Sequence, residues 1–415
     1  MKRRLLPRNV SLLCRRKGSV DGNPVYRSHR MTAAKDSRNT PPASCYIVTL
    51  KYAPGHKTLL AAFAHGYESV TGVRPRLILS RSYEWMFSAE EAKDIIFWGT
   101  SNKWGEVAAD SLRFLAKDWL KFSQMLRNDH PEHMYICSPH PLNLAFIRLA
   151  RSANPECRIL NHIHEPKAYR GVKREVILQL KERVVEAVQR PAITQSDDLI
   201  VSSRMAEAAL SSIVSNKSIH RIPLLSEDYA TREKRERKYF TYIGSLNVRR
   251  GIRRFLQLAE ACNLRAIDAQ FQIVSRDNLR PYLAGVSEST IGRLRIVNRD
   301  RITNHEIGEA LRESIACMIL YDFPMMQSGV VPAAMMAGTP VICYKIGGMV
   351  EHLTQYKNAV MLDLGDPVEK LVEAVCYARD HQSEMEEACR STFESVFSEL
   401  NWPRYYRWLF EEKRA

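Results

Sequence analysis

Two successive series of alternating apolar and amphipathic segments constrain the fold of this chain most strongly. Each short apolar run predicts a buried strand, and the longer segment after it predicts a helix. The expected strands of the first series are 46–50, 76–80, 95–98, 134–138, 158–164 and 199–202, with helices at 56–70, 107–127, 142–151 and 172–189. Those of the second series are 239–243, 271–275, 295–297, 317–321, 340–344 and 359–362. Alternation of this kind builds a parallel sheet with helices on both faces.

A polar and charged segment, SEDYATREKRERK at residues 226–238, separates the two series and predicts an interdomain linker. We therefore expect an N-terminal lobe at 45–225 and a C-terminal lobe at 239–400. A tail at 1–44 precedes them, and an aromatic-rich helix within 401–415 follows. With 415 residues and 45% hydrophobic content, the chain can supply two cores. The sequence thus predicts an α/β protein of two doubly wound, Rossmann-like lobes with a cleft between them.

The net charge of +15 is concentrated at the amino terminus. Residues 1–40 hold eleven Lys and Arg against Asp21 and Asp36, a net charge of +9. Such an arm suits a solvated disordered tail, an anionic membrane surface or a nucleic acid. The sequence has no zinc finger or helix-turn-helix pattern, so we expect no nucleic acid partner.

Other features of the sequence limit the compartment. The chain lacks an apolar run of about 18 residues, which a membrane-spanning helix needs. The apolar part of its basic start, residues 10–13, is too short for a signal peptide. Nine cysteines without a C-x-x-C pair suggest small buried side chains. We expect a cytoplasmic protein, with a peripheral contact on the inner membrane face as an alternative.

The segment QSGVVPAAMMAGTPVICYKIGGMVEHL, which begins at Gln327, predicts a ligand site. Gln327, Ser328 and Gly329 open a helix of small residues, where free N–H groups favour an anion such as a nucleotide diphosphate. A buried strand follows, and the paired glycines Gly347 and Gly348 let the backbone approach a ligand closely.

This segment resembles the donor half of family 4 retaining glycosyltransferases, which have the two-lobed GT-B fold. A helix ending in G-T-P-V and a G-G-x-x-E turn recur there. The family's usual pair of glutamates falls at Met325 and Ala333 here, so the chain is closer to a variant with Q-S-G. Within TYIGSLNVRRGI, Gly244 allows a tight turn and Arg249 or Arg250 could reach a diphosphate, whereas Ser245 replaces the family's usual arginine.

The resemblance implies a set of donor-binding residues. They are Gly244, Ser245, Arg249, Arg250, Gln327, Ser328, Gly329, Gly347, Gly348 and Glu351. Glu351 would accept hydrogen bonds from sugar or ribose hydroxyls; a helix-terminal acid is the alternative. Arg249 and Arg250 could also belong to a solvated helix face.

The first lobe carries the expected catalytic residues. In CRILNHIHEPKAY, Pro166 ends a strand at the edge of the sheet where ligands bind, and the resemblance places His164 and Glu165 against the sugar. His162 shares the face of His164, but no third residue with convincing spacing completes a metal site, so we expect no metal. Gly55 and His56 fall on the acceptor-side loop, where a plain strand-to-helix turn is the alternative.

Two further segments have alternative interpretations. Ser202 and Ser203 match the family's strand-end serine but could be a helix cap. The helix at 112–126 carries Phe114, Trp119 and Phe122 beside lysines. We favour a core stripe there over a membrane-surface helix.

The resemblance implies a metal-independent, retaining transferase without a cofactor. It would move a sugar from a nucleoside-diphosphate sugar to a glycan or lipid-linked acceptor, in surface polysaccharide assembly. A sugar-nucleotide epimerase, a non-catalytic nucleotide-sugar-binding protein and a nucleic-acid protein acting through its basic arm are the alternatives. The sequence leaves the sugar, the base, the acceptor and the oligomeric state open.

Overall fold

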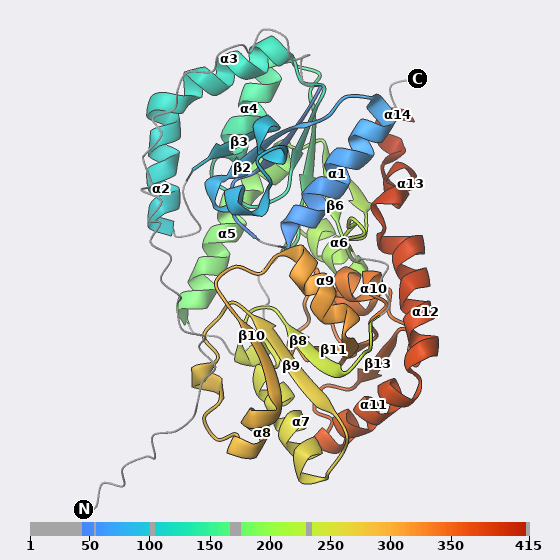
Figure 1. Ribbon diagram of the computed structural model, residues 1–415. Helices are drawn as coiled ribbons and strands as arrows, with labels where there is room; N and C mark the ends of the chain where they lie inside the picture. Colours follow the sequence, from blue (N-terminus) through green and yellow to red (C-terminus); the bar gives the residue numbers. More distant parts are fainter. Residues whose placement is uncertain (1–43, 54, 100–103, 167–175, 230–234, 412–415) are drawn as a thin grey trace, which may run out of the picture. The chain divides into compact units, whose positions relative to one another are not determined.

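Two parallel sheets organise the computed structural model, which describes residues 44–53, 55–99, 104–166, 176–229 and 235–411. The first sheet has the order β3-β2-β1-β4-β5-β6-β7 (Figure 1). Its strands are β1 (Cys45–Thr49), β2 (Arg76–Ser80), β3 (Ile95–Trp98), β4 (His133–Ile136), β5 (Arg158–His162), β6 (Asp198–Val201) and β7 (Ser218–Arg221). The second sheet has the order β10-β9-β8-β11-β12-β13. Its strands are β8 (Tyr239–Ile243), β9 (Gln270–Ser275), β10 (Leu294–Asn298), β11 (Ser314–Ile319), β12 (Val341–Tyr344) and β13 (Ala359–Leu362).

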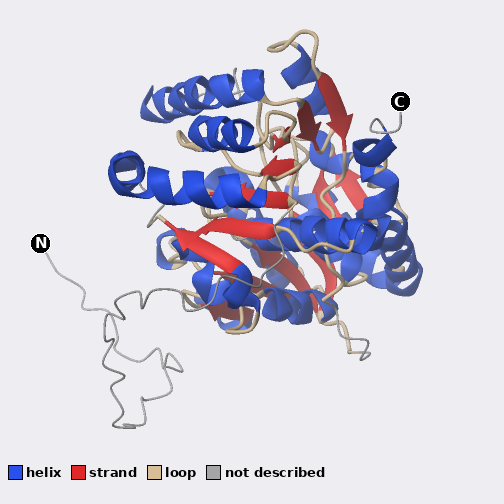
Figure 2. Ribbon diagram, turned by 90° about the horizontal axis from the view of Figure 1, so that it is seen from above, coloured by secondary structure: helices blue, strands red, loops and turns tan. Residues whose placement is uncertain are grey.

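Helices cover both faces of the strands (Figure 2). In the first lobe they are α1 (His56–Thr71), α2 (Trp104–Arg113), α3 (Trp119–Asp129), α4 (Asn143–Ala153), α5 (Val176–Gln195) and α6 (Arg204–Ser211). In the second they are α7 (Ile252–Leu264), α8 (Glu288–Arg293), α9 (Asn304–Arg312), α10 (Val330–Met336), α11 (Val368–Asp380) and α12 (Gln382–Thr392). Each lobe has the predicted parallel, doubly wound architecture, in which ligands bind beyond the carboxyl ends of the strands.

Buried aliphatic and aromatic side chains form a core on each face of both sheets. Because a strand alternates its side chains, Tyr46 and Val48 enter one core of the first lobe, while Cys45 and Ile47 enter the other. The described strands are buried along most of their length. This is the expected pattern for parallel strands covered on both faces.

The last helices, α13 (Trp402–Tyr406) and α14 (Trp408–Glu411), pack on the first lobe. Figure 1 shows the C-terminal helices in red running back beside α1. Trp402 is buried against Gly66 of α1, where an added Cβ would lie 2.1 Å from the indole. Gly66 therefore provides the space that the indole fills.

Several sequence predictions need correction or lie outside the description. Strand β7 was not predicted, because its side chains are only partly buried and show no apolar run. The predicted helix at 107–127 is interrupted by a π-helical turn at Phe114–Asp118. The charged linker is only partly a linker, since the Arg237 side chain is buried and donates hydrogen bonds to the carbonyl oxygens of Leu311, Ser314 and Ala337. Residues 1–43 lie outside the described residues.

Two predictions about composition can be compared with the structure. Eight cysteines lie in the described part of the chain; all are free, and seven are buried. Within that part, the helices are all too short or too polar to cross a bilayer.

Candidate functional site

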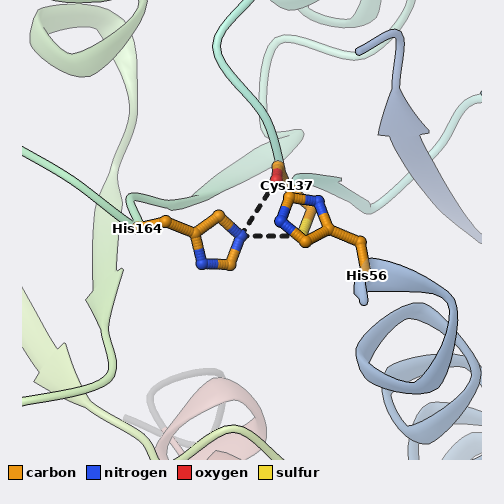
Figure 3. Close-up of side chains that lie close together, drawn as sticks. All are labelled: His56, Cys137 and His164. Carbon is orange, nitrogen blue, oxygen red and sulfur yellow. Dashed lines mark hydrogen bonds between the residues drawn. The ribbon is translucent and has the colours of Figure 1, made fainter. Parts of the chain in front are cut away.

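His164 lies directly beyond the carboxyl end of β5, where Pro166 prevents the strand from continuing. Its Nε2 lies 3.2 Å from the carbonyl oxygen of Cys137 and 3.5 Å from the Cys137 Sγ (Figure 3). Burial lowers the pKa of His164 to about 4, so the imidazole is neutral at pH 7. A neutral imidazole offers one hydrogen-bond donor and one acceptor to a ligand.

Two more histidines stack against His164. The ring of His56, the first residue of α1, lies 4.3 Å from it between centroids, and the ring of His162 lies 4.6 Å from it. Burial, with a contribution from the neighbouring histidines, lowers the pKa of both. Both ring nitrogens of His162 are occupied, by the Tyr135 hydroxyl at 2.6 Å and by Ser202 Oγ at 2.9 Å. His162 therefore supports the site from inside the protein.

The second lobe reaches this histidine cluster through Gln327. The side-chain amide of Gln327 hydrogen-bonds Nδ1 of His164. Close by, the Glu351 carboxylate accepts a hydrogen bond from the backbone N–H of Arg204 at the start of α6. The carboxyl edges of the two sheets are thus joined by polar contacts that involve predicted site residues.

Arg250 and Gly244 lie together at the carboxyl end of β8. Gly244 has a φ of +118°, which favours glycine, and a Cβ there would lie 3.9 Å from Nη1 of Arg250. The Arg250 guanidinium lies over the ring of Tyr321, 5.7 Å from its centroid. Arg249 points elsewhere, forming an ion pair with Asp322 at 3.4 Å and lying over Phe323. Of the two arginines proposed from the sequence, Arg250 is the better placed to meet an anion.

The loop before α10 differs from the sequence expectation in its details. The helix begins at Val330 after Gly329 and is short, because it ends at Met336. Ser328 is buried, and its hydroxyl lies 3.4 Å from that of Tyr321. Gly329 is exposed and has open space around its Cβ position.

The paired glycines are required by contacts within the protein. A Cβ on Gly347, whose φ is +77°, would lie 2.4 Å from the carbonyl oxygen of Met325. A Cβ on Gly348 would lie 2.4 Å from both the Met326 carbonyl oxygen and Ser203 Oγ. Ser203 caps α6 by accepting a hydrogen bond from the Ala206 N–H, so its helix-cap interpretation is confirmed. The glycines bring the donor-side loop of the second lobe against the start of α6.

The remaining predicted residues lie around this centre. Glu165 is exposed beside His164. The exposed Ser245 accepts a hydrogen bond from the Tyr242 hydroxyl at its carbonyl oxygen. Gly55 precedes α1 with an ordinary φ of −67° and open space at its Cβ position, so the protein's own packing does not require glycine there.

Met325 and Ala333, the positions of the family's usual glutamates, are both buried in the apolar core beside β11 and β12. Carboxylates there would need burial among apolar side chains, which is costly. The structure also reveals Cys137, which sequence reasoning missed. Its only signal was its place directly after a buried strand next to the strand that ends at His162.

Comparison with protein families identifies the second lobe. Residues 237–380 match the family described as Glycosyl transferases group 1. A comparison with curated protein sequences finds no significant match.

Solved structures resemble the whole two-lobed architecture. Anabaena Alr3699/HepE in complex with UDP matches with a TM-score of 0.66 and 12% identity over 89% of this chain and 100% of the other. Sucrose-phosphate synthase from Thermosynechococcus elongatus matches with a TM-score of 0.67 and 14% identity over 89% and 100%. The apo form of the lipopolysaccharide outer core galactosyltransferase WaaB has a TM-score of 0.58 and 15% identity over 89% and 99%. The chain therefore has the GT-B fold, and its second lobe is of the glycosyltransferase group 1 type.

Proposed function

We propose that this protein is a glycosyltransferase that moves a sugar from a nucleoside-diphosphate sugar to a glycan or lipid-linked acceptor. The observation that carries the proposal is the convergence of Arg250, Gln327 and His164 at the facing edges of the two sheets. The family match over residues 237–380 supports it independently. Relatives by fold crystallised with UDP and with UDP-glucose support a nucleotide-sugar donor.

The diphosphate would bind to the second lobe beside Gly244 and Arg250. Negative charge on the leaving diphosphate grows as the glycosidic bond breaks, so a guanidinium fixed there stabilises the transition state more than the ground state. Ser328 and Gly329 would add hydrogen-bond donors. This assignment needs no cofactor and no divalent cation, and it is what makes us propose a metal-independent reaction.

His164 would contact the sugar or the diphosphate from the first lobe, with Glu165 beside it. Its neutral imidazole can donate one hydrogen bond and accept another. In the present structure Gln327 occupies Nδ1, so a donor that reaches this nitrogen must displace or share the amide. His56 and Gly55 would lie on the acceptor side. Membership of family 4 with its Q-S-G variant, and retention of anomeric configuration, belong to the same proposal.

A non-catalytic nucleotide-sugar-binding protein is the second candidate. It is favoured by the burial of Met325 and Ala333 in place of the usual glutamates and by the engagement of Glu351 with Arg204. Such a protein would bind the donor without hydrolysing or transferring it.

A peripheral membrane contact would suit a lipid-linked acceptor and a role in surface polysaccharide assembly. The α2–α3 segment buries Phe114 and Phe122, which confirms the core interpretation of its aromatic stripe. Its outer surface, however, exposes Leu112, Leu115 and Leu120 to 71%, 60% and 79%. The exposed cations beside these leucines are Arg113, Lys117, Lys121 and Arg127. Leucines interleaved with cations favour an anionic membrane surface. We propose this surface for the cytoplasmic side of the inner membrane.

A panel of UDP-, GDP-, dTDP- and ADP-sugars tests the function. We expect one of them to raise the thermal unfolding temperature and to be hydrolysed slowly in the absence of acceptor. Stabilisation without hydrolysis or transfer would favour the binding protein. No shift with any member of the panel would contradict the donor site.

A further inference from the structure

We propose that His56, Cys137 and His164, together called the His-Cys-His cluster, form a binding site for Zn²⁺. One ligand atom from each of the three side chains lies within 4.8 Å of the other two (Figure 3). Imidazole nitrogen and thiolate sulfur are the ligands that Zn²⁺ prefers. The site goes beyond the proposed transferase function, which needs no metal ion.

The parallel sheet brings the three ligands together from distant parts of the sequence. Strand β4 pairs with β1 on one side and β5 on the other, so the carboxyl ends of the three strands lie side by side. Cys137 follows β4, His164 lies two residues beyond β5, and His56 begins the helix after β1. Three adjacent strand ends thus supply one ligand each. Spacing in the sequence cannot reveal such a set.

Gln327 is placed to set the tautomer of His164. Its Oε1 is buried without a hydrogen-bond partner among the described residues, while its Nε2 meets Nδ1 of His164. Exchanging the amide oxygen and nitrogen keeps the same shape and lets Nδ1–H donate to Oε1. The lone pair of His164 is then on Nε2, which lies 3.5 Å from the Cys137 Sγ. A ligating histidine usually donates its second N–H in this way.

His56 also has an unsatisfied ring nitrogen. Its Nδ1 is buried and has no hydrogen-bond partner among the described residues. His162 is excluded as a fourth ligand because Tyr135 and Ser202 occupy both its nitrogens. Three protein ligands leave the fourth tetrahedral position to water or to a bound molecule. Binding releases the Cys137 thiol proton to solvent, because the metal ligand is the thiolate.

Two observations bear on competing interpretations. Lys51 is an exposed cation whose charge reaches His56 and His164, so it opposes a second cation, although solvent screens it. A second group, His65, Glu227 and Glu399, also lies within ligand distance. There the half-exposed His65 already forms ion pairs with Glu399 at 3.2 Å and Glu227 at 3.7 Å, which explain the arrangement without a metal.

Cobalt(II) titration of the metal-free full chain tests the site, because a cobalt–thiolate bond adds near-ultraviolet absorption. We expect about one equivalent of Co²⁺ to give this band, following from the single thiol in the cluster, and Zn²⁺ to abolish it by displacement. Cys137→Ser should lose the band. His56→Gln should weaken binding by about tenfold or more, and Gln327→Ala by about tenfold as an outer contact.

Matched controls separate the site from other thiols and from misfolding. Cys157 is also buried but precedes β5 at the opposite end of the strand, so Cys157→Ser should keep the band. His65→Gln should keep it as well. Unfolding temperatures without metal identify any variant that fails to fold, and His56→Gln at a half-buried helix start then replaces Cys137→Ser. A band that persists in Cys137→Ser, or its absence from the wild type, would overturn the proposal.

An effect on transfer rests on the proposed function. Zn²⁺ bound to His164 would occupy the histidine that faces the donor, so we expect chelator-reversible inhibition that Cys137→Ser relieves. If transfer itself is never detected, the cobalt titration still decides the metal site. Failure of the two proposals is therefore distinguishable.

Discussion

The side-chain amide of Gln327 in the second lobe hydrogen-bonds the imidazole of His164 in the first. The two residues are distant in sequence and belong to different sheets. Their contact means that the residue opposite the donor loop is already polar, neutral and held in place. A ligand entering here replaces one specific hydrogen bond rather than filling an apolar space.

His164→Ala should remove turnover while sparing donor binding. The imidazole contacts a group whose charge or geometry changes during transfer, so its loss should lower kcat on the order of a hundredfold or more. Donor affinity from thermal shifts should change little, because Arg250 and the second lobe remain. His65→Ala, an exposed histidine of the same lobe, is the control. Full turnover in His164→Ala would demote the residue to a structural role.

Arg250→Ala should weaken nucleotide-sugar binding. A charge-assisted contact to a diphosphate contributes about 1.5–3 kcal/mol, or about ten- to a hundredfold in Kd. Arg253, exposed on the following helix, gives the matched control of equal charge change. Calorimetric titration with the stabilising nucleotide sugar measures both variants. Equal affinity of Arg250→Ala and wild type would remove Arg250 from the donor site.

The parallel sheets were predictable because buried strands produce apolar runs that no other element of this length requires. The short strand β7 escaped prediction, since its half-exposed residues lack such a run. In the site, His164 was found because Pro166 marks the end of its strand. Cys137 was not found, because its partners come from neighbouring strands that only the sheet order brings together. Glu351 was assigned to a ligand, yet the N–H of Arg204 from the other lobe engages it.

His140 should make the protein less stable as the pH falls. Burial lowers its pKa to about 4, below the value of about 6.5 in an unfolded chain. Between these values the unfolded state takes up a proton that the folded state does not. The stabilisation is therefore complete above pH 6.5 and is lost towards pH 4, by about 1.4 kcal/mol per pH unit.

Urea unfolding of His140→Gln at several pH values measures this contribution. Glutamine can still accept the Leu142 N–H, which lies 3.2 Å from His140 Nδ1. The free energy of unfolding of the variant should fall less steeply than that of the wild type between pH 6.5 and 4. His65 gives the opposite sign, since its hydrogen bond to Glu399 raises its pKa. Its stabilisation is present below about pH 6.5 and is lost as the pH rises through its folded pKa. Parallel curves for His140→Gln and wild type would contradict the assignment.

Gly348→Ala should destabilise the contact between the donor loop and α6. The added methyl group would lie 2.4 Å from the Met326 carbonyl oxygen and from Ser203 Oγ, so backbone must move. Overpacking of this kind costs about 1–3 kcal/mol. Gly329→Ala, in the same loop region with open space at its Cβ position, should change the free energy of unfolding far less. Equal stability of the two variants would show that the loop adapts without strain.

The exposed leucines of α2 and α3 should decide membrane association. Leu115→Asp and Leu120→Asp place charge on the surface that would enter the headgroup region, and each also reduces the positive charge beside it. We expect sedimentation with vesicles of anionic phospholipid to fall at least severalfold, and the wild-type interaction to weaken with salt. Leu264→Asp is the control, because Leu264 is 78% exposed on the second lobe. If all three variants bind vesicles like the wild type, the leucines serve another purpose and the membrane proposal fails.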